Sequence, residues 1–320
     1  MRSALLLVLT AFGASLCFGA EVYPGKPVRV VVGWPPGTTV DLVARVMSQQ
    51  LSEQLGQSFL VDNRPGASGT IGTAIAAKSA PDGYTLIMIE TSFSIAPSLF
   101  KSLPYEGIKD FTPITQVLSA PMVLVVHPSV KANTLKEFVA LAHENPGKLN
   151  YASAGTGSIV QLAAELFKIA TKTNIVNVPY KGGGEMVTGL LGGQVQMLVA
   201  TIPTVLALVK SGKLRALAVT TDGRRSPSMT DVPSMSEAGV SGMTVYTWFG
   251  FVGLAGMPKE LVNKLHVEVV KALAAPSVKG QIMAQGGEAV GSSPEEFSRH
   301  IRSELQRWAD VIKSAGITAE

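Results

Sequence analysis

The amino-acid sequence predicts an α/β protein of two lobes, each a mostly parallel sheet flanked by helices, with two crossings of the chain between them. Short apolar runs of strand length alternate with longer amphipathic stretches, which is typical of a mostly parallel sheet. A strand, a glycine-bearing loop and a helix follow one another once in each half, at residues 28–45 and 149–171. The 320 residues suffice for one large or two medium domains. Two similar units in a chain of this length favour two lobes.

The chain begins with the pattern of a secretory signal peptide. Arg2 provides a positive start, residues 4–12 are apolar, and small residues follow before Glu21. The uncharged run is marginal for a membrane span, which takes about 20 predominantly apolar residues. We therefore expect residues 1–20 to be cleaved and the mature protein to be exported and soluble. A retained membrane anchor is the alternative.

Cysteine content and charge exclude several classes of function. Cys17 is the only cysteine and lies in the leader, so the mature chain has none for a disulfide, thiol catalysis or an iron–sulfur cluster. The formal net charge is +4, and removal of Arg2 with the leader leaves +3. The basic residues are scattered, which argues against a nucleic-acid-binding surface.

The first strand–loop–helix unit organises the chain. Residues 28–32 (VRVVV) predict a buried strand, because β-branched side chains pack well on a pleated sheet. Residues 33–37 (GWPPG) break the pattern and form an exposed loop, and Thr38 or Thr39 can cap a helix that starts near Val40. Free backbone N–H groups and the positive end of the helix dipole then favour an anion at this loop.

The second unit repeats this arrangement later in the chain. A short strand at 149–153 leads into the loop 154–158 (AGTGS), and a long amphipathic helix is predicted at 159–171. The segment 180–185 (YKGGGE) opens another helix of the same kind. A small anion held between the two lobes would therefore meet a glycine loop and a helix N-terminus from each.

The remaining elements follow from shorter patterns. A glycine-rich loop is expected at 63–72, a polar strand end at 90–94 just before Pro97, and a long loop at 223–242. Strands are predicted at residues 57–62, 84–89, 122–126, 175–178, 194–200, 215–220 and 245–254, and helices at residues 74–78, 134–143, 259–273 and 294–314.

Two crossings, near residues 120–128 and 242–250, divide the chain into lobes. The first lobe is expected to comprise residues 21–121 plus 246–320, and the second lobe residues 122–245. Ligands of open α/β sheets favour the crevice at the carboxyl ends of the strands, and pockets favour domain interfaces. The ligand is therefore expected between the lobes.

No cofactor, metal or catalytic constellation is predicted. The run Gly155-Thr156-Gly157 lacks the third glycine of a dinucleotide fingerprint, because Val160 stands there, and the chain has no phosphate-loop motif. The four histidines are far apart and lack ligand spacing. The nucleophile elbow of serine hydrolases is absent, and no pairing is visible among the carboxylates Asp41, Glu90, Glu165 and Glu185. The protein is therefore not expected to be an enzyme.

The positive case is binding through hydroxyl and backbone N–H groups. Such groups suit a carboxylate, which accepts several hydrogen bonds. Each hydroxyl also has a structural interpretation as a helix cap or turn residue, but their repeated placement before helices favours a binding role. Trp34 either walls the pocket or packs on the core, and Lys181 either neutralises an anion or is solvated. The hydroxyls in or beside the loops are those of Thr38, Thr39, Ser68, Thr70, Ser92, Ser153, Thr156 and Ser158.

The residues as a whole resemble the Bug family, the extracytoplasmic substrate-binding receptors of tripartite tricarboxylate transporters. The resemblance covers essentially the whole mature chain in the right order. It rests on YPGKPVRVVV, PPGTTVDLVAR, NRPGASGTIG, PDGYTL, KDFTPI, NPGKLNYASAGTGS, VPYKGGG, GKLRALAVT, WFGFVGLAGMP and PEEF.

This resemblance implies a periplasmic binding protein of the type II topology that closes about a hinge. Such a receptor is not an enzyme; it captures a small di-, tri- or aromatic carboxylate and delivers it to the permease subunits of the transporter, here as a monomer. The family's binding segments correspond to residues 34–41, 153–158 and 180–184. Together with the loops, the resemblance predicts as ligand-binding residues Trp34, Pro36, Gly37, Thr38, Thr39, Asp41, Ser68, Ser92, Ser153, Ala154, Gly155, Thr156, Gly157, Ser158, Tyr180, Lys181, Gly182 and Thr201.

Three departures from the family pattern concern the ligand. Thr38 replaces a usual glycine, Gln161 stands where histidine is frequent, and Ala200 replaces a common acidic residue. The missing acid argues against a ligand with an amino group. Two other functions stay open: a ligand sensor that signals to a membrane protein, and a secreted hydrolase or isomerase on the same fold.

Overall fold

The computed structural model describes residues 23–318, and the predicted signal peptide lies outside this range. The strands are β1 Val28–Val32, β2 Phe59–Asn63, β3 Thr85–Glu90, β4 Phe111–Val126, β5 Asn150–Ser153, β6 Val176–Pro179, β7 Met197–Thr201, β8 Arg215–Val219, β9 Tyr246–Leu254 and β10 Glu288–Ala289. The helices are α1 Thr39–Leu55, α2 Thr70–Ala77, α3 Ser92–Leu99, α4 Leu135–Glu144, α5 Ile159–Thr171, α6 Gly183–Leu191, α7 Ile202–Lys210, α8 Lys259–Ala274, α9 Pro276–Ala284 and α10 Pro294–Ala315. Two 3-10 turns, η1 Ala67–Gly69 and η2 Gly107–Asp110, complete the elements.

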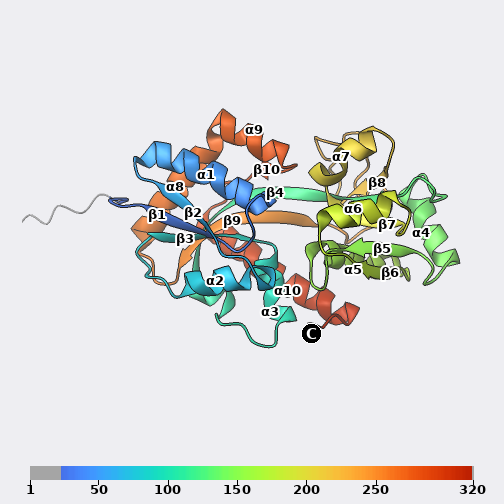
Figure 1. Ribbon diagram of the computed structural model, residues 1–320, viewed down its shortest axis with the longest axis horizontal. Coiled ribbons are helices and arrows are strands. Elements are labelled where there is room, and N and C mark those ends of the chain that lie inside the picture. The colour runs from blue at the N-terminus through green and yellow to red at the C-terminus, as the bar shows by residue number, and fades with distance from the viewer. Residues whose placement is uncertain (1–22, 319–320) are drawn as a thin grey trace, which may run out of the picture.

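The molecule has two lobes, which the long strands β4 and β9 join (Figure 1). The strand order is β2-β1-β3-β9-β4-β7-β5-β6, with β8 and β10 also pairing with β4. Strands β1, β2 and β3 are parallel to one another, as are β5, β6 and β7, whereas β4 and β9 run antiparallel to their neighbours. The sheet is therefore mixed, and its parallel parts lie in separate lobes.

Strand β4 changes partner where the chain passes between the lobes. It pairs with β9 up to Pro121 and with β7 and β8 from Met122 onward. The hydroxyl of Thr220 ties this point to the return crossing, because it accepts a hydrogen bond from Met122 N at 2.8 Å and donates to Val245 O at 2.5 Å. Both crossings are thus held at one place.

The first lobe has a core on each face of its sheet. Alternate valines of β1 point to opposite faces, so Val30 and Val32 pack with helices α1, α8 and α9, while Val31 packs toward α2 and α3. The second lobe has one large core around β4, β5 and β7. Two first-lobe elements contribute to it, because Leu99 of α3 and Trp308 of α10 are part of this core. Helix α10 therefore packs on both lobes.

Several predicted elements differ from the structure. The helix at 159–171 has the predicted bounds, but β4 is longer than its predicted core of residues 122–126. Residues 92–99 form helix α3 rather than a polar strand end, because burial of Phe93, Ile95 and Leu99 outweighs the cost of Pro97 inside the helix. Helices α7 and α9 were not predicted. Within residues 23–318, no helix combines the length and the hydrophobicity needed to cross a bilayer.

Candidate functional site

The carboxyl ends of parallel strands from both lobes meet beside the crossing. Glu90, the last residue of β3, lies opposite Phe249 of β9, and Phe249 lies opposite Leu118 of β4. A few residues along β4, Met122 lies opposite Thr201, the last residue of β7. The two strand ends therefore lie on either side of the point where β4 changes partner, which is the expected place for a ligand.

A cavity of about 160 Å³ occupies this place. It lies between the β1–α1 loop, the end of β3, the crossing strands, the β7–α7 junction and the end of α9. Four of the predicted ligand-binding residues line it, namely Trp34, Thr38, Thr39 and Thr201. Sequence reasoning missed the other lining residues, which are Val40, Glu90, Ala120, Thr247, Phe249 and Gln285.

Two helix N-termini, one from each lobe, border this cavity. Thr38 is the cap residue of α1 and Thr201 that of α7, and both have extended backbones. Neither threonine uses its hydroxyl to cap its own helix: Thr38 Oγ1 donates to Pro35 O at 2.8 Å, and Thr201 Oγ1 shares a 2.7 Å hydrogen bond with Thr204 Oγ1. Both helix dipoles therefore present partial positive charge at the cavity.

Asp41 does not line the cavity; its carboxylate stabilises the β1–α1 loop through hydrogen bonds. Its side chain is 1% exposed and accepts hydrogen bonds from Gly37 N at 2.9 Å, Asn63 Nδ2 at 2.8 Å and Arg45 Nε at 3.0 Å. Burial alone would raise the pKa of Asp41, but the bonds from Arg45, Gly37 and Asn63 together hold it below its usual range. The predicted residues Pro36 and Gly37 are exposed in the same loop.

Glu90 connects three other predicted residues, Trp34, Ser92 and Ser68, through hydrogen bonds. Trp34 Nε1 donates to Glu90 Oε1 at 3.1 Å, and Ser92 Oγ is hydrogen bonded to the same oxygen. Ser92 Oγ also lies 3.0 Å from Ser68 O, so it joins the 3-10 turn η1 to the start of α3. Burial raises the pKa of the Glu90 carboxyl more than these donors lower it.

The loop that carries Trp34 rests directly on backbone. A Cβ atom at Gly33 would lie 2.8 Å from Gly69 Cα and Gly69 O, and one at Gly72 would lie 2.8 Å from Gly33 Cα. Real Cβ atoms do not approach other atoms so closely. The glycines at 69 and 72 therefore allow the backbone there to pack directly on Gly33, and this contact positions Trp34, the next residue.

The second-lobe loop does not line this cavity. Ser158 caps α5, accepting from Gln161 N at 3.3 Å, and a Cβ at Gly157 would collide with Leu99 of α3. The Ser153 hydroxyl is buried and has no hydrogen-bond partner among the described residues. The other predicted residues outside the cavity lining are Ala154, Gly155, Thr156, Tyr180, Lys181 and Gly182; Ala154, Thr156 and Lys181 are exposed.

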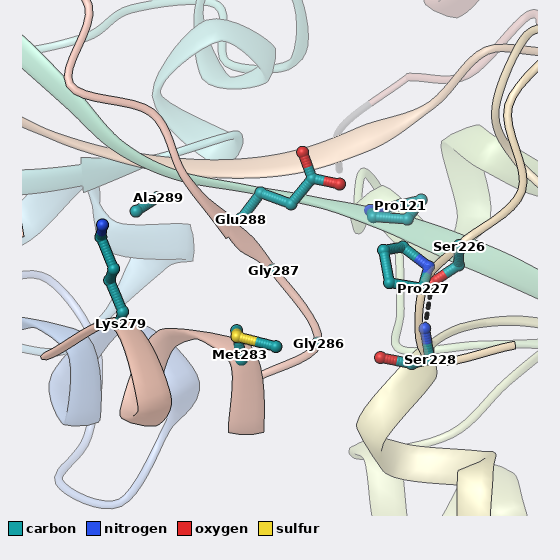
Figure 2. A pocket seen from close by; sticks show the side chains of 10 residues that line it. All are labelled: Pro121, Ser226, Pro227, Ser228, Lys279, Met283, Gly286, Gly287, Glu288 and Ala289. Atoms are coloured by element: carbon teal, nitrogen blue, oxygen red, sulfur yellow. Dashed lines mark hydrogen bonds between the residues drawn. The ribbon is translucent and has the colours of Figure 1, made fainter. Parts of the chain in front are cut away.

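A second groove, of about 310 Å³, is lined in part by the connection between α9 and β10 (Figure 2). There, Pro121 and residues 226–228 face Met283 and Glu288 across the junction of the lobes (Figure 2). Gly286 of this groove packs closely on Pro203 of α7, and the residue before it, Gln285, lines the cavity at the strand ends. The groove includes neither of the glycine loops at the starts of α1 and α5, so we regard the cavity at the strand ends as the functional site. Within residues 23–318, no cluster of side chains is suited to a metal ion.

Comparison with known proteins identifies close relatives over almost the whole chain. The sequence profile of the tripartite tricarboxylate transporter family receptors matches residues 43–317. Protein BugT of Bordetella pertussis is 36% identical over 97% of this chain and 95% of its own. Among solved structures, one described as a periplasmic transporter is 38% identical with a TM-score of 0.80, covering 93% of this chain and 100% of its own. An R. palustris protein solved with adipate is 34% identical with a TM-score of 0.81, at the same coverage.

Proposed function

We infer the function from the family: the chain belongs to the tripartite tricarboxylate transporter family receptors, whose profile matches most of its length. It is a solute-binding receptor of the Bug type. We propose that it works in the periplasm, binds a small organic carboxylate between its lobes, and delivers it to the permease subunits of a tripartite transporter. We also propose that it binds its ligand without chemical turnover, as its receptor relatives suggest.

One observation carries the carboxylate assignment: the N-termini of α1 and α7 converge on one cavity from different lobes. A carboxylate there gains from two helix dipoles and from threonine hydroxyls, without a cationic side chain. Adipate in the R. palustris relative is consistent with a ligand of this class.

We propose further that residues 21–121 with 246–320, and residues 122–245, are the lobes that close on the ligand. The support is the exchange of partners by β4 at Met122 and the shared tie through Thr220. Closure about this point would bring Ser153–Ser158 to the ligand, since this loop already touches α3 through Gly157 and Leu99.

Ligand binding is tested first by thermal shift on the protein from Glu21 onward, after unfolding and refolding to remove any bound compound. A carboxylate at 100 times its dissociation constant is expected to stabilise the folded protein by about 2.7 kcal/mol, visible as a higher melting temperature. The variant Thr201→Val is expected to weaken affinity about threefold to tenfold through loss of one hydroxyl at the cavity. Thr188→Val, on the exposed face of α6, is the matched control. No shift with any di-, tri- or aromatic carboxylate would refute the assignment.

Lobe closure is tested by Ser153→Ala. The Ser153 hydroxyl lacks a partner among the described residues, so its removal is expected to leave the free energy of unfolding within about 0.5 kcal/mol of wild type. If closure brings the hydroxyl to the ligand, affinity falls by about fivefold or more, as measured by calorimetry. Ser158→Ala serves as the contrast, because loss of the α5 cap is expected to cost about 1 kcal/mol of stability. Unchanged affinity in Ser153→Ala would contradict the proposed closure.

A further inference from the structure

Glu90 places a negative charge in the cavity, which repels a ligand that carries only carboxylates. Among the described residues that line the cavity, it is the one charged side chain, and the polar ones are four threonines and Gln285. A ligand that carries only carboxylates would therefore meet a like charge and no arginine or lysine there. The dipoles of α1 and α7 supply the positive potential of the site.

The position of Glu90 is fixed by the fold, and part of its acceptor capacity is left over. It ends β3, and the side-chain donors Trp34 Nε1 and Ser92 Oγ both meet the same oxygen, Oε1. The backbone N–H groups of Ser92 and Thr91 also interact with the carboxylate. Within residues 23–318, no side chain donates a hydrogen bond to Oε2. A carboxylate oxygen accepts more than one hydrogen bond, so Glu90 can take a donor from a molecule in the cavity.

Because Glu90 is buried, a hydrogen-bond donor on the ligand would stabilise its charged form. Desolvation raises the pKa of Glu90 despite the bonds from Ser92, Trp34 and the Thr91 backbone, so its charged form is under-compensated in the free protein. A second carboxylate nearby would disfavour that form further, whereas an ammonium or hydroxyl group would stabilise it. Glu90 is therefore expected to raise the affinity for ligands that carry a hydrogen-bond donor and to lower it for ligands that carry only carboxylates.

We infer that Glu90 selects acids that also carry a hydrogen-bond donor, above all an ammonium group, which it binds while the helix N-termini bind the carboxylate. This inference rests on the proposed carboxylate-binding function of the same cavity. It also reverses an expectation from the sequence, where Ala200 in place of an acid argued against an amino group. The acid comes instead from the first lobe, at the end of β3.

The test uses pairs of acids that share a carbon skeleton and differ by one ammonium group: succinate and aspartate, glutarate and glutamate, adipate and 2-aminoadipate. Affinities are measured by calorimetry on refolded, ligand-free protein. Wild type is expected to bind the amino acid of at least one pair about tenfold more tightly than the diacid, as an added charged hydrogen bond implies. Glu90→Gln, which keeps the size and removes the charge, is expected to abolish this preference. Glu90→Asp keeps the charge and is expected to retain it.

Glu288→Gln is the matched control, because this exposed carboxylate lies in the neighbouring groove beyond Gly286 (Figure 2). It should leave all affinities unchanged. Preference for the diacid in every pair would overturn the inference while leaving the receptor function intact. A preference that survives Glu90→Gln would also overturn it, since Glu90 would then take no part in selection. Binding of no carboxylate at all would refute the proposed function together with the inference.

Discussion

Replacement of Trp248 by alanine is expected to lower the free energy of unfolding by about 3–5 kcal/mol, as for other buried tryptophans. Trp248 lies in β9 next to the crossing and is fully buried. Its ring packs edge-to-face on Phe297 and on His300, with centroid distances of 5.7 and 5.2 Å. Its Nε1 donates to the buried carboxylate of Glu304, which also accepts from Trp308 Nε1 at 2.9 Å. The substitution thus leaves a cavity between β9 and α10 and removes one donor from a buried charge.

Urea unfolding of the protein from Glu21 measures this loss, and Trp34→Ala is the control. Trp34 is partly exposed and lines the binding cavity. Its removal should cost less stability, about 1–2 kcal/mol, because Trp34 packs only at the edge of the first-lobe core, although one hydrogen bond to Glu90 is also lost. It should nevertheless weaken ligand binding. If Trp34→Ala destabilised the protein as much as Trp248→Ala, the distinction between a structural and a binding tryptophan would be wrong.

The sequence predicts the local units well because each is encoded by neighbouring residues. The valines of β1, the Gly-Trp-Pro-Pro-Gly loop and the apolar stripe of α1 lie within one stretch, so the strand, loop and helix could be predicted together. The same holds for α5, whose cap Ser158 and periodic apolar positions are contiguous. The hydroxyls at Thr38, Thr39 and Thr201 were predicted for the site and do line the cavity.

The missed parts depend on contacts between distant segments. Helix α9 has no clear apolar stripe, so its pattern did not reveal it, and Gln285 at its end was missed with it. Ala120 and Thr247 reach the cavity only because β4 pairs with β9, with these two residues directly opposite each other. Glu90 was visible as a strand-end carboxylate, but its place in the cavity follows from the antiparallel pairing of β3 with β9. Register between remote strands is not visible in one sequence.

Replacement of Gly72 by alanine is expected to destabilise the protein by about 3 kcal/mol, at the upper end for overpacking. The added Cβ would lie 2.8 Å from Gly33 Cα and 2.9 Å from Arg64 O. Both are backbone atoms in the packed interior beneath the binding loop, so neither can move aside as a flexible side chain would. The stack of Gly33 on residues 69–72 must then open.

The same substitution is expected to weaken ligand binding, because Gly33 directly precedes Trp34 and a displaced loop moves the N-terminus of α1. Urea unfolding and calorimetry on Gly72→Ala measure the two effects. Gly280→Ala is the control: its added Cβ meets nothing within 4 Å in the exposed middle of α9. There, alanine should stabilise the helix by about 0.5–1 kcal/mol and leave affinity unchanged. If Gly72→Ala kept wild-type stability and affinity, the close backbone approach could not be what positions Trp34, and the geometry of the cavity would need another cause.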